Sequence, residues 1–305
     1  MRVSTPLSLV ENRFGILGAT KLLLDAGFDA LDMPFHQKGS ELYVDGQLNV
    51  ALLRECRKMV EDRGAVWNQA HALFPVIRQT GTPEDEEYNR ITPKLIEENI
   101  RMCAVIGAPQ IVVHPIAFAG VSKEEQLARN IEYFRPMVHV AKECGVRVLV
   151  ENMWGHHRDL KGRIVENVCS NGMELAHYSD VFVREFNAPD NVGVLVDVGH
   201  TGLVGLNADD MIREVGGERL YGIHLHDNDF YRDTHQLPFL EKMNFEEIIK
   251  ALIDVNYQGD ITFEAGTFFA RFPDQLIPAT ARLMFEVGDY FRRRVTEGIV
   301  ANDGE

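Results

Sequence analysis

Apolar runs that end abruptly in a histidine or an acidic residue recur along this chain of 305 residues. Stretches long enough for a helix separate the runs. A β-rich run followed by a helical segment, repeated about eight times, is typical of an α/β fold in which a parallel (β/α)8 or TIM barrel is wrapped by helices. Catalytic groups of such barrels lie where strands end, so the pattern indicates a metal-centred site. The runs end, in order, at Asp32, His71, His114, Glu151, Asp197, His226 and Glu264.

The chain shows no feature that would divide it into parts. No linker, low-complexity segment or charge block interrupts it, and barrels of about 250 residues are routine single domains. We therefore expect one barrel domain over residues 1–305. No apolar stretch approaches the ~20 residues that span a bilayer, and the N-terminus lacks the pattern of a signal peptide. The 4 cysteines are scattered, which fits a reducing compartment. A cytoplasmic protein without a membrane partner is expected.

The charge balance restricts the partners. Lysine and arginine number 31 against 46 acidic residues, which gives a net charge of −15. A polyanion such as DNA would be repelled at long range, and no basic strip offsets this, so no nucleic-acid partner is expected. A small neutral substrate, or a phosphorylated one bound by a few cations, suits the chain better. The cations available for a phosphate are Arg158, Lys161, Arg232 and Lys242.

Periodicity and capping residues place the helices. A helix over residues 17–26 is expected to follow the first strand. A helix over residues 84–106 should be interrupted near Pro93, because proline removes a backbone donor and clashes with the preceding turn. The last helix should cover residues 274–294, and the tail after Thr296 should be frayed.

Three carboxylates and one imidazole are predicted at the ends of strands five to eight, as neighbours around one side of the barrel mouth. Carboxylates brought this close would disfavour each other's ionised form, and a divalent cation removes that conflict. Mixed oxygen and nitrogen ligation suits Mn²⁺, Mg²⁺, Co²⁺ or Zn²⁺, and no thiolate favours zinc alone. The predicted metal ligands are Glu151, Asp197, His224 and Glu264.

Two short motifs add histidines to the same mouth. In the D-V-G-H motif, Gly199 is expected to let the chain bend away from the strand so that Asp197 and His200 face the site together. In the I-H-L-H motif, His224 and His226 point to the same face because the side-chain period of a strand is two. His224 is the better ligand candidate, and His226 is expected to pack or hydrogen-bond beside it.

Further histidines lie at strand ends or in loops. His71 and His114 end strands three and four and are expected to face the same mouth as the acids. The R-D-T-H motif contains Arg232, Asp233 and His235, in a loop that either folds over the mouth or is solvated.

The connection over residues 152–172 is long, polar and rich in histidine. Loops of this length in a compact barrel are usually lids or binding loops. Trp154, followed by His156 and His157, is expected either to form an aromatic wall against a substrate or simply to pack within the loop.

The motifs VENMWG, DVGH, IHLHDND with RDTH, and ITFEAG resemble the xylose-isomerase-like barrel superfamily, in particular its sugar phosphate isomerase/epimerase group. The resemblance covers nearly the whole chain. It implies a metal-dependent isomerase or epimerase, with Mn²⁺ as the leading metal, that acts on a small carbohydrate by proton transfer through an enediolate. It further implies that Glu151, Asp197, His224 and Glu264 hold the metal and that the two glutamates move the proton. The residues expected to contact substrate are His71, His114, Trp154, His200, His226 and Arg232.

The resemblance leaves alternatives open. The same superfamily contains apurinic-site endonucleases with three zinc ions, and a lyase or dehydratase acting on a keto-sugar or inosose would use the same proton abstraction. The LPFLEKMNF segment departs from the Gly-x-Gly of many relatives, which puts a substrate contact from that loop in doubt. By analogy with related barrels we expect a homo-oligomer. Under the three-zinc alternative the additional ligands would be His71, His114, His200, Asp233 and His235.

Overall fold

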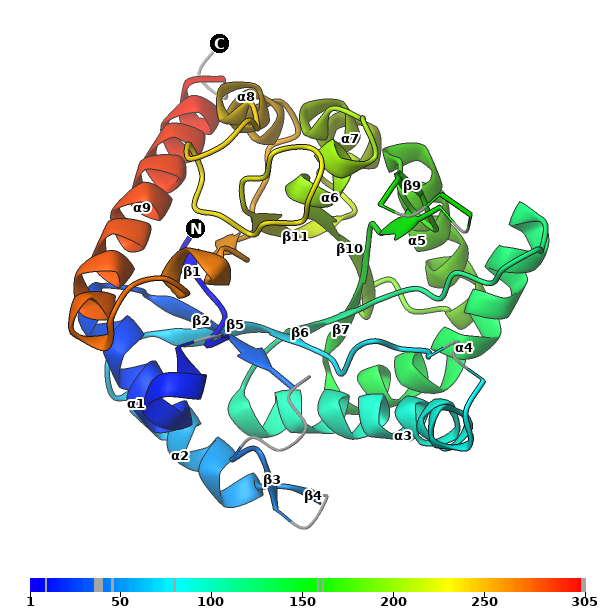
Figure 1. Ribbon diagram of the computed structural model, residues 1–305, viewed down its shortest axis with the longest axis horizontal. Coiled ribbons are helices and arrows are strands. Elements are labelled where there is room, and N and C mark those ends of the chain that lie inside the picture. The colour runs from blue at the N-terminus through cyan, green and yellow to red at the C-terminus, as the bar shows by residue number, and fades with distance from the viewer. Residues whose placement is uncertain are drawn as a thin grey trace.

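Eight parallel strands form the centre of the computed structural model, which describes residues 1–8, 10–35, 41–44, 47–78, 81–157, 159–160 and 162–302. Their order is β1-β12-β11-β10-β7-β6-β5-β2. Asp32 closes the ring, because its N–H donates to Thr5 O at 3.1 Å and its carbonyl accepts from Leu7 N at 3.3 Å. The predicted barrel is confirmed (Figure 1). The strands are β1 (Val3–Ser4), β2 (Ala30–Pro34), β5 (Val66–His71), β6 (Gln110–Val113), β7 (Arg147–Glu151), β10 (Val192–Asp197), β11 (Leu220–Leu225) and β12 (Ile261–Phe263).

Helices surround the strands on the outside of the ring (Figure 1). Several begin at a side chain that caps the first turn: Ser122 Oγ, for example, accepts from Glu125 N at 3.2 Å. Such a cap satisfies a backbone donor that has no partner within the helix. The helices are α1 (Glu11–Ala26), α2 (Val50–Glu61), α3 (Pro83–Ile106), α4 (Lys123–Cys144), α5 (Gly172–Phe186), α6 (Val198–Leu203), α7 (Ala208–Val215), α8 (Phe245–Asp254) and α9 (Ile277–Asn302), with 3₁₀ turns at Gly266–Phe269 and Asp274–Leu276.

Three helix predictions need correction. α1 begins before residue 17, with a first turn separated from the rest by a kink at Gly15, where φ is 71°. α3 runs through Pro93 without a break, packed between α2 and α4. The tail after Thr296 is helical to Asn302, because Gly298 lets α9 approach α8: a Cβ there would lie 2.3 Å from Ile253 Cδ1.

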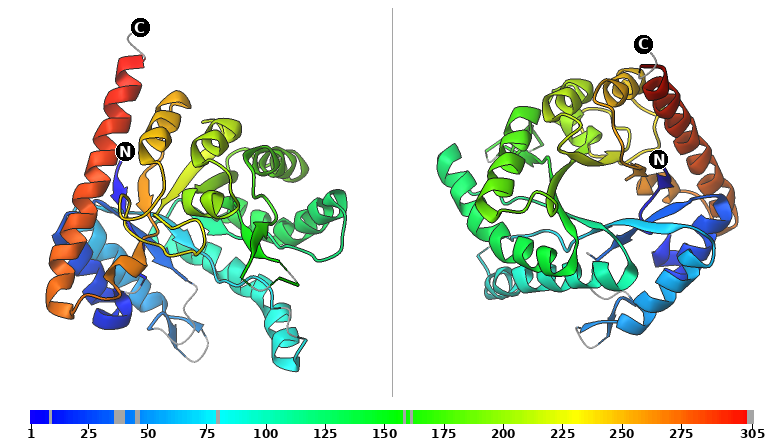
Figure 2. Two further views of the ribbon diagram at one scale, coloured as in Figure 1. Left: turned by 45° about the horizontal axis from the view of Figure 1, so that its top comes forward. Right: turned by 180° about the vertical axis from the view of Figure 1, so that it is seen from behind.

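Two additions lie at the ends of the barrel strands. The predicted loop over residues 152–172 contains an antiparallel hairpin of β8 (Trp154–His156) and β9 (Ile164–Glu166). A second small sheet pairs β3 (Tyr43–Val44) with β4 (Gln47–Leu48). The left panel of Figure 2 shows both sheets projecting from the same side of the barrel. The hairpin is therefore placed to shape the mouth.

The barrel interior contains an apolar layer beneath this mouth. Val112, Leu149 and Leu195 are fully buried and form a cluster of their own. Each lies two positions before a strand-end residue of the predicted site, and residues two apart on a strand share a face. The layer therefore separates the mouth from the opposite end of the barrel. No helix of the described chain is long and apolar enough to cross a membrane.

Candidate metal centre

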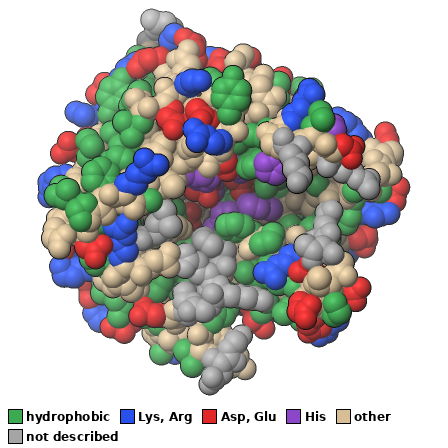
Figure 3. Space-filling model, viewed as in Figure 1, with side chains coloured by type: hydrophobic (Ala, Val, Ile, Leu, Met, Phe, Trp, Pro, Cys, Tyr) green, Lys and Arg blue, Asp and Glu red, His purple; other side chains and the backbone are tan. Residues whose placement is uncertain are grey.

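Imidazoles and carboxylates converge in a hollow at the C-terminal ends of the strands, which Figure 3 shows at the centre of the face. Among the described residues, four groups of three or four such side chains each offer ligand atoms within 4.8 Å of one another. The structure thus brings together the four predicted metal ligands and the other predicted histidines of the mouth. The groups are His71, His114 and Glu151; Glu151, Asp197, His224 and Glu264; His200, Asp233 and His235; and His226, His235 and Glu264.

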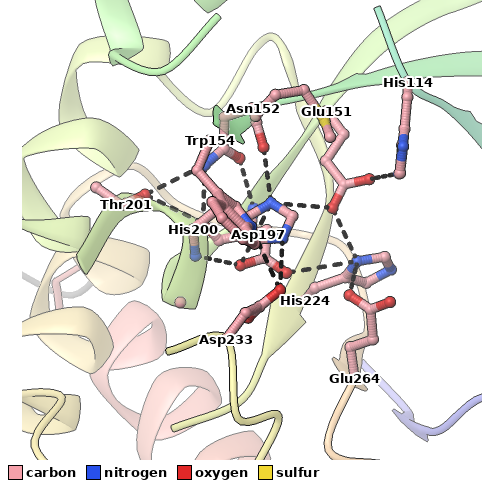
Figure 4. Close-up of polar contacts among 12 residues, drawn as sticks. His114, Glu151, Asn152, Trp154, Asp197, His200, Thr201, His224, Asp233 and Glu264 are labelled. Atoms are coloured by element: carbon pink, nitrogen blue, oxygen red, sulfur yellow. Dashed lines mark hydrogen bonds and ion pairs between the residues drawn. The ribbon is translucent and has the colours of Figure 1, made fainter. Parts of the chain in front are cut away.

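Glu151, fully buried at the end of β7, belongs to two of these groups (Figure 4). Its Oε2 lies 2.9 Å from His114 Nε2 and 3.6 Å from His71 Nε2. Its Oε1 lies 3.4 Å from His224 Nδ1 and 3.7 Å from His200 Nδ1. One carboxylate therefore joins the predicted quartet to the histidines at the ends of β5 and β6.

His224 lies at the centre of the quartet. Its Nδ1 is 3.0 Å from Glu264 Oε2, 3.4 Å from Glu151 Oε1 and 3.9 Å from Asp197 Oδ2. On the other side of the ring, Nε2 lies 2.9 Å from Gln69 Nε2, and this amide also donates to Asp32 Oδ2 at 2.9 Å. Gln69, held in turn by Asp32, thus fixes the orientation of the ring from behind.

Asp197 ends β10 and also caps α6, since its Oδ1 accepts from His200 N at 2.7 Å. This cap aims His200 at the mouth. Gly199 is not the bend that we predicted, because it lies within α6. The glycine is required because the ring of His226 lies against it and would be 2.0 Å from a Cβ. His226 Nε2 in turn lies 3.0 Å from Asp197 Oδ1.

The loop after β11 folds over the mouth. Asp233 Oδ2 lies 3.0 Å from His235 Nε2 and 3.6 Å from His200 Nε2, and it accepts from Trp154 Nε1 at 3.3 Å. Buried Asp227 anchors the loop by accepting backbone N–H groups at both of its ends. Asp233 and His235 therefore belong to a loop that folds over the mouth, and the alternative of a solvated loop is excluded for them.

Three of the described histidines have one ring nitrogen held by a backbone carbonyl. His71 Nδ1 lies 2.9 Å from Ala72 O, His200 Nδ1 lies 2.9 Å from Asn152 O, and His235 Nδ1 lies 2.6 Å from Glu264 O. A carbonyl only accepts, so Nδ1 carries the proton in each ring. In a neutral ring the lone pair then lies on Nε2, which faces the carboxylates. This is the arrangement of a histidine that ligates a metal.

Two ligand atoms at the centre of the cluster lack a hydrogen bond. Glu151 Oε2 and His224 Nδ1 are buried and make no hydrogen bond to the described residues, although His114 Nε2 lies 2.9 Å from the first and Glu264 Oε2 lies 3.0 Å from the second. A divalent cation fits this donor set of imidazole nitrogens and carboxylate oxygens without thiolate.

The charges in the cluster are strongly coupled. Burial alone would raise the pKa of Glu151, but the adjacent His114, His224 and His71 hold it well below its usual value. Burial would likewise lower the pKa of His224, and Glu264 and Glu151 raise it well above. Without a cation, His224 would therefore hold a second proton. A cation would have to displace this proton, which makes its affinity rise with pH.

Some predicted substrate contacts lie elsewhere. Arg232 is 77% exposed and is bound to Asp229, with Nη2 2.6 Å from Oδ2. Lys242 is exposed and lies over the ring of Tyr231. His156 is exposed beside Trp154, with the ring centroids 4.9 Å apart. Arg158 and Lys161 lie outside the described residues. Arg232 and Lys242 are thus not brought into the cluster.

Sequence reasoning missed several residues that shape the site. Asn152 donates to Asp197 O at 2.9 Å and accepts from Asp197 N at 2.7 Å, which locks β7 to β10 beside the quartet. Phe74, 39% exposed, packs its ring against His71 and His114. Asn152 directly follows a predicted ligand, and that position was the available signal. Phe74 gave no signal beyond its neighbourhood to His71.

The chain is similar to known proteins over most of its length. The family model described as Xylose isomerase-like TIM barrel matches residues 20–284. The chain is 25% identical to Uncharacterized protein y4fM of Sinorhizobium fredii over 274 residues, 82% of this chain and 81% of that protein. It is 26% identical to Probable endonuclease 4 of Shouchella clausii over 190 residues, 56% of this chain and 60% of that protein.

Solved structures share the fold. A D-tagatose 3-epimerase-like protein superimposes with a TM-score of 0.73 at 19% identity, covering 98% of this chain and all of that one (100%). The IOLI protein, solved with a bound zinc atom, has a TM-score of 0.68 at 16% identity, covering 97% of this chain and 99% of that one.

Proposed function

The chain belongs to the xylose isomerase-like TIM barrel family, and on that premise we propose that it is a divalent-metal-dependent isomerase or epimerase of a small sugar or sugar phosphate. The observation that carries the proposal is the convergence of Glu151 and Glu264 on His224 Nδ1, at 3.4 and 3.0 Å. Structures of similar fold bear epimerase names, which supports the assignment.

The metal would be held by the predicted quartet, Glu151, Asp197, His224 and Glu264. When bound, such a cation supplies positive charge that stabilises the negative charge developing on two neighbouring oxygens of a sugar. We propose Mn²⁺ as the leading candidate, because carboxylate-rich ligation suits it. Mg²⁺, Co²⁺ and Zn²⁺ are compatible with the same donors.

The two glutamates would transfer the proton. Each carboxylate has a second oxygen besides the one that approaches His224, and a carboxylate can remove a proton from the carbon next to a carbonyl. Glu151 would take this proton, and Glu264 would return it. Return by the other glutamate to the opposite face inverts the carbon, which is epimerisation; transfer by one glutamate to the neighbouring carbon is isomerisation.

Aromatic rings and histidines would bind the sugar. Trp154 and Phe74 are both at the mouth and only half buried, and aromatic faces offer apolar surface to sugar C–H groups. His200 and His114, next to Glu151, would donate or accept hydrogen bonds with hydroxyl groups. The apolar layer of Val112, Leu149 and Leu195 closes the floor of the site.

The test is proton exchange at the substrate carbon. The purified protein, with its metal content measured by elemental analysis, is incubated with a panel of aldoses, ketoses and their phosphates in D₂O, and products are followed by NMR. Deuterium at the carbon next to the carbonyl, together with a new sugar, is expected, and Glu151→Gln should abolish the exchange. Undiminished exchange in that variant would remove Glu151 from its proposed role. Loss of water or of a β-substituent would instead identify a lyase.

A second function is favoured by one specific observation: the group His200, Asp233 and His235 adjoins the quartet, and Glu151 links the quartet to His71 and His114. Three such groups would suit a hydrolase with several zinc ions, and one relative is named a probable endonuclease. The net charge of −15 disfavours a DNA substrate. Two or three zinc ions per chain, with nicking of a duplex containing an abasic site, would establish the hydrolase in place of the isomerase.

A further inference from the structure

A cavity of about 540 Å³ lies at the opposite end of the barrel, where the strands begin. This is the end seen from behind in the right panel of Figure 2. Its lining comes from the first residues of β5, β6, β7 and β11 and from the segment before β12. The polar and charged side chains of the lining include Arg2, Gln110, Arg147, Tyr221 and Asp260.

Arg147 brings an uncompensated positive charge to this cavity. It makes no ion pair within 4.0 Å and no side-chain hydrogen bond among the described residues, and its Nε is buried without a partner. Arg2, the other arginine of the lining, is paired with Asp260. Asp260 Oδ1 accepts from Arg2 N at 2.7 Å, and Oδ2 lies 3.9 Å from Nη1. Among the described residues, Arg54, Arg163, Arg271 and Arg282 also have no carboxylate within 4.0 Å, but they are exposed, whereas Arg147 is half-buried.

The guanidinium of Arg147 is held in a fixed orientation. Its Cζ lies 3.7 Å from the centroid of the Tyr221 ring. The two side chains meet across Gly193 on the intervening strand, where a Cβ would lie 2.4 Å from Tyr221 Cδ2 and 3.0 Å from Arg147 Cδ. Gln110 Nε2 donates to the backbone O of Tyr221 at 3.2 Å and so helps to hold the tyrosine in place. A stacked arginine keeps its N–H edge available for bidentate binding of an oxyanion.

The cavity is distinct from the candidate metal centre. Side chains two residues apart on a strand point to the same face. Arg147, Leu149 and Glu151 therefore share one face of β7, and Leu149 lies between the arginine and the metal-centre carboxylate. Gln110, Val112 and His114 repeat this order on the neighbouring strand. The layer of Val112, Leu149 and Leu195 is fully buried. A molecule bound at Arg147 is therefore not the substrate at the mouth.

We propose that this cavity is a binding site for a small molecule with a phosphate or carboxylate group, which pairs with Arg147. Its volume falls within the roughly 300–1,000 Å³ of small-molecule sites, so there is room for an organic part beside the anion. The amides of Gln110 and Gln258 and the ring of Tyr221 line that room. The site stands independently of the proposed reaction.

The test is calorimetric titration of the metal-loaded protein with inorganic phosphate and, separately, with succinate, at constant ionic strength set by chloride. Saturable binding of at least one of the two is expected. Arg147→Met should weaken it at least tenfold, and Arg147→Lys should weaken it less, because lysine keeps the charge and loses the planar fork. Arg184→Met is the matched control, since it removes the same charge from a side chain that is 71% exposed on α5.

The two probes distinguish the sources of the anion: preference for phosphate indicates a phosphorylated ligand, and preference for succinate a carboxylate. Circular dichroism and metal content show whether each variant is folded, and if Arg147→Met fails to fold, Arg147→Lys carries the comparison with the wild type. Absence of saturable binding for both anions overturns the proposal. Binding that is equally strong in the folded Arg147 variants also overturns it, because the anion would then be bound at the metal centre.

Discussion

The imidazole of His226 rests on the backbone of Gly199, so closely that a Cβ at residue 199 would lie 2.0 Å from the ring's Cε1 and 2.4 Å from its Nε2. The same Nε2 lies 3.0 and 3.1 Å from the two carboxylate oxygens of Asp197. The ring is therefore confined between the helix that carries His200 and the carboxylate that caps it.

Gly199→Ala should consequently push His226 away from Asp197. We expect a loss of about 1–3 kcal/mol in the free energy of unfolding, the usual range for overpacking of a buried site, measured by urea denaturation. The double variant Gly199→Ala/His226→Ala is the control. If the ring is the cause, alanine at residue 199 should cost little when His226 is already removed. An equal loss in both backgrounds would place the clash elsewhere.

Gln69→Leu should weaken metal binding without altering any proposed ligand. The amide nitrogen lies 2.9 Å from His224 Nε2, and its loss would leave a buried ring nitrogen without a partner. Loss of such an outer contact typically lowers metal affinity about 10–100-fold, which a competition titration with a chromogenic chelator would measure. Gln275→Leu, on an exposed 3₁₀ turn, should leave the affinity unchanged. Equal affinities for wild type and Gln69→Leu would refute a supporting role.

Asp227→Asn should loosen the loop that carries Asp233 and His235. Its buried carboxylate accepts from Glu241 N at 2.7 Å and from Lys242 N at 2.9 Å, and thus ties the end of the loop to its beginning. Bonds to a charged acceptor are worth about 1.5–3 kcal/mol each, so we expect amide hydrogen exchange over residues 229–241 to accelerate at least tenfold.

The matched control for the loop is Asp229→Asn. Asp229 accepts from Tyr231 N and Arg232 N within the loop and does not join its two ends. Exchange over the rest of the loop should stay close to that of the wild type in this variant. Similar acceleration in both variants would mean that Asp227 is not the anchor.

Glu11→Gln should change how stability depends on pH. Glu11 is buried at the start of α1, and neither carboxyl oxygen has a hydrogen-bond partner among the described residues. Burial, reinforced by the charge of Asp32, raises its pKa from 4.5 to about 8. The folded chain thus keeps a proton that the unfolded chain releases above pH 4.5. The carboxyl's contribution to stability is full below that pH and is lost as the pH rises toward 8.

The difference between wild type and Glu11→Gln isolates this loss, because the amide does not ionise. Between pH 5 and 8 the wild type should lose stability relative to the variant, by at most about 1.4 kcal/mol per pH unit. Urea denaturation at several pH values measures the difference. Glu84→Gln, at an exposed position in the first turn of α3, should show no such trend. A constant difference across the range would mean that Glu11 is ionised in the folded protein.

The strand-end ligands could be predicted because a local rule places them. Apolar runs identified the strands, and parallel strands in a ring bring their last residues to one mouth. Glu151, Asp197 and His224 could therefore be predicted to lie together from their positions at strand ends alone. The same rule placed His71 and His114 beside Glu151.

Residues that act through tertiary contacts could not be predicted in this way. Asp227 anchors backbone groups some fourteen to sixteen positions away, and Gln69 meets His224 across the barrel. Such pairs leave no periodic pattern in the sequence. Gly199 shows the same limit: a bend was predicted there, but a glycine is required because the ring of His226 lies against it. Pro93 was expected to interrupt a helix that tertiary packing keeps continuous.

The contact between Trp154 and Asp233, 3.3 Å from Nε1 to Oδ2, joins two insertions that follow different strands. Both insertions lie outside the barrel, whereas Glu151, Asp197 and Glu264 are fixed by the strands themselves. Natural selection can therefore lengthen, shorten or exchange the entrance in a descendant gene while the chemical machinery is inherited intact. Changes in these two insertions would adapt the site to new substrates, and we expect related proteins to differ there first.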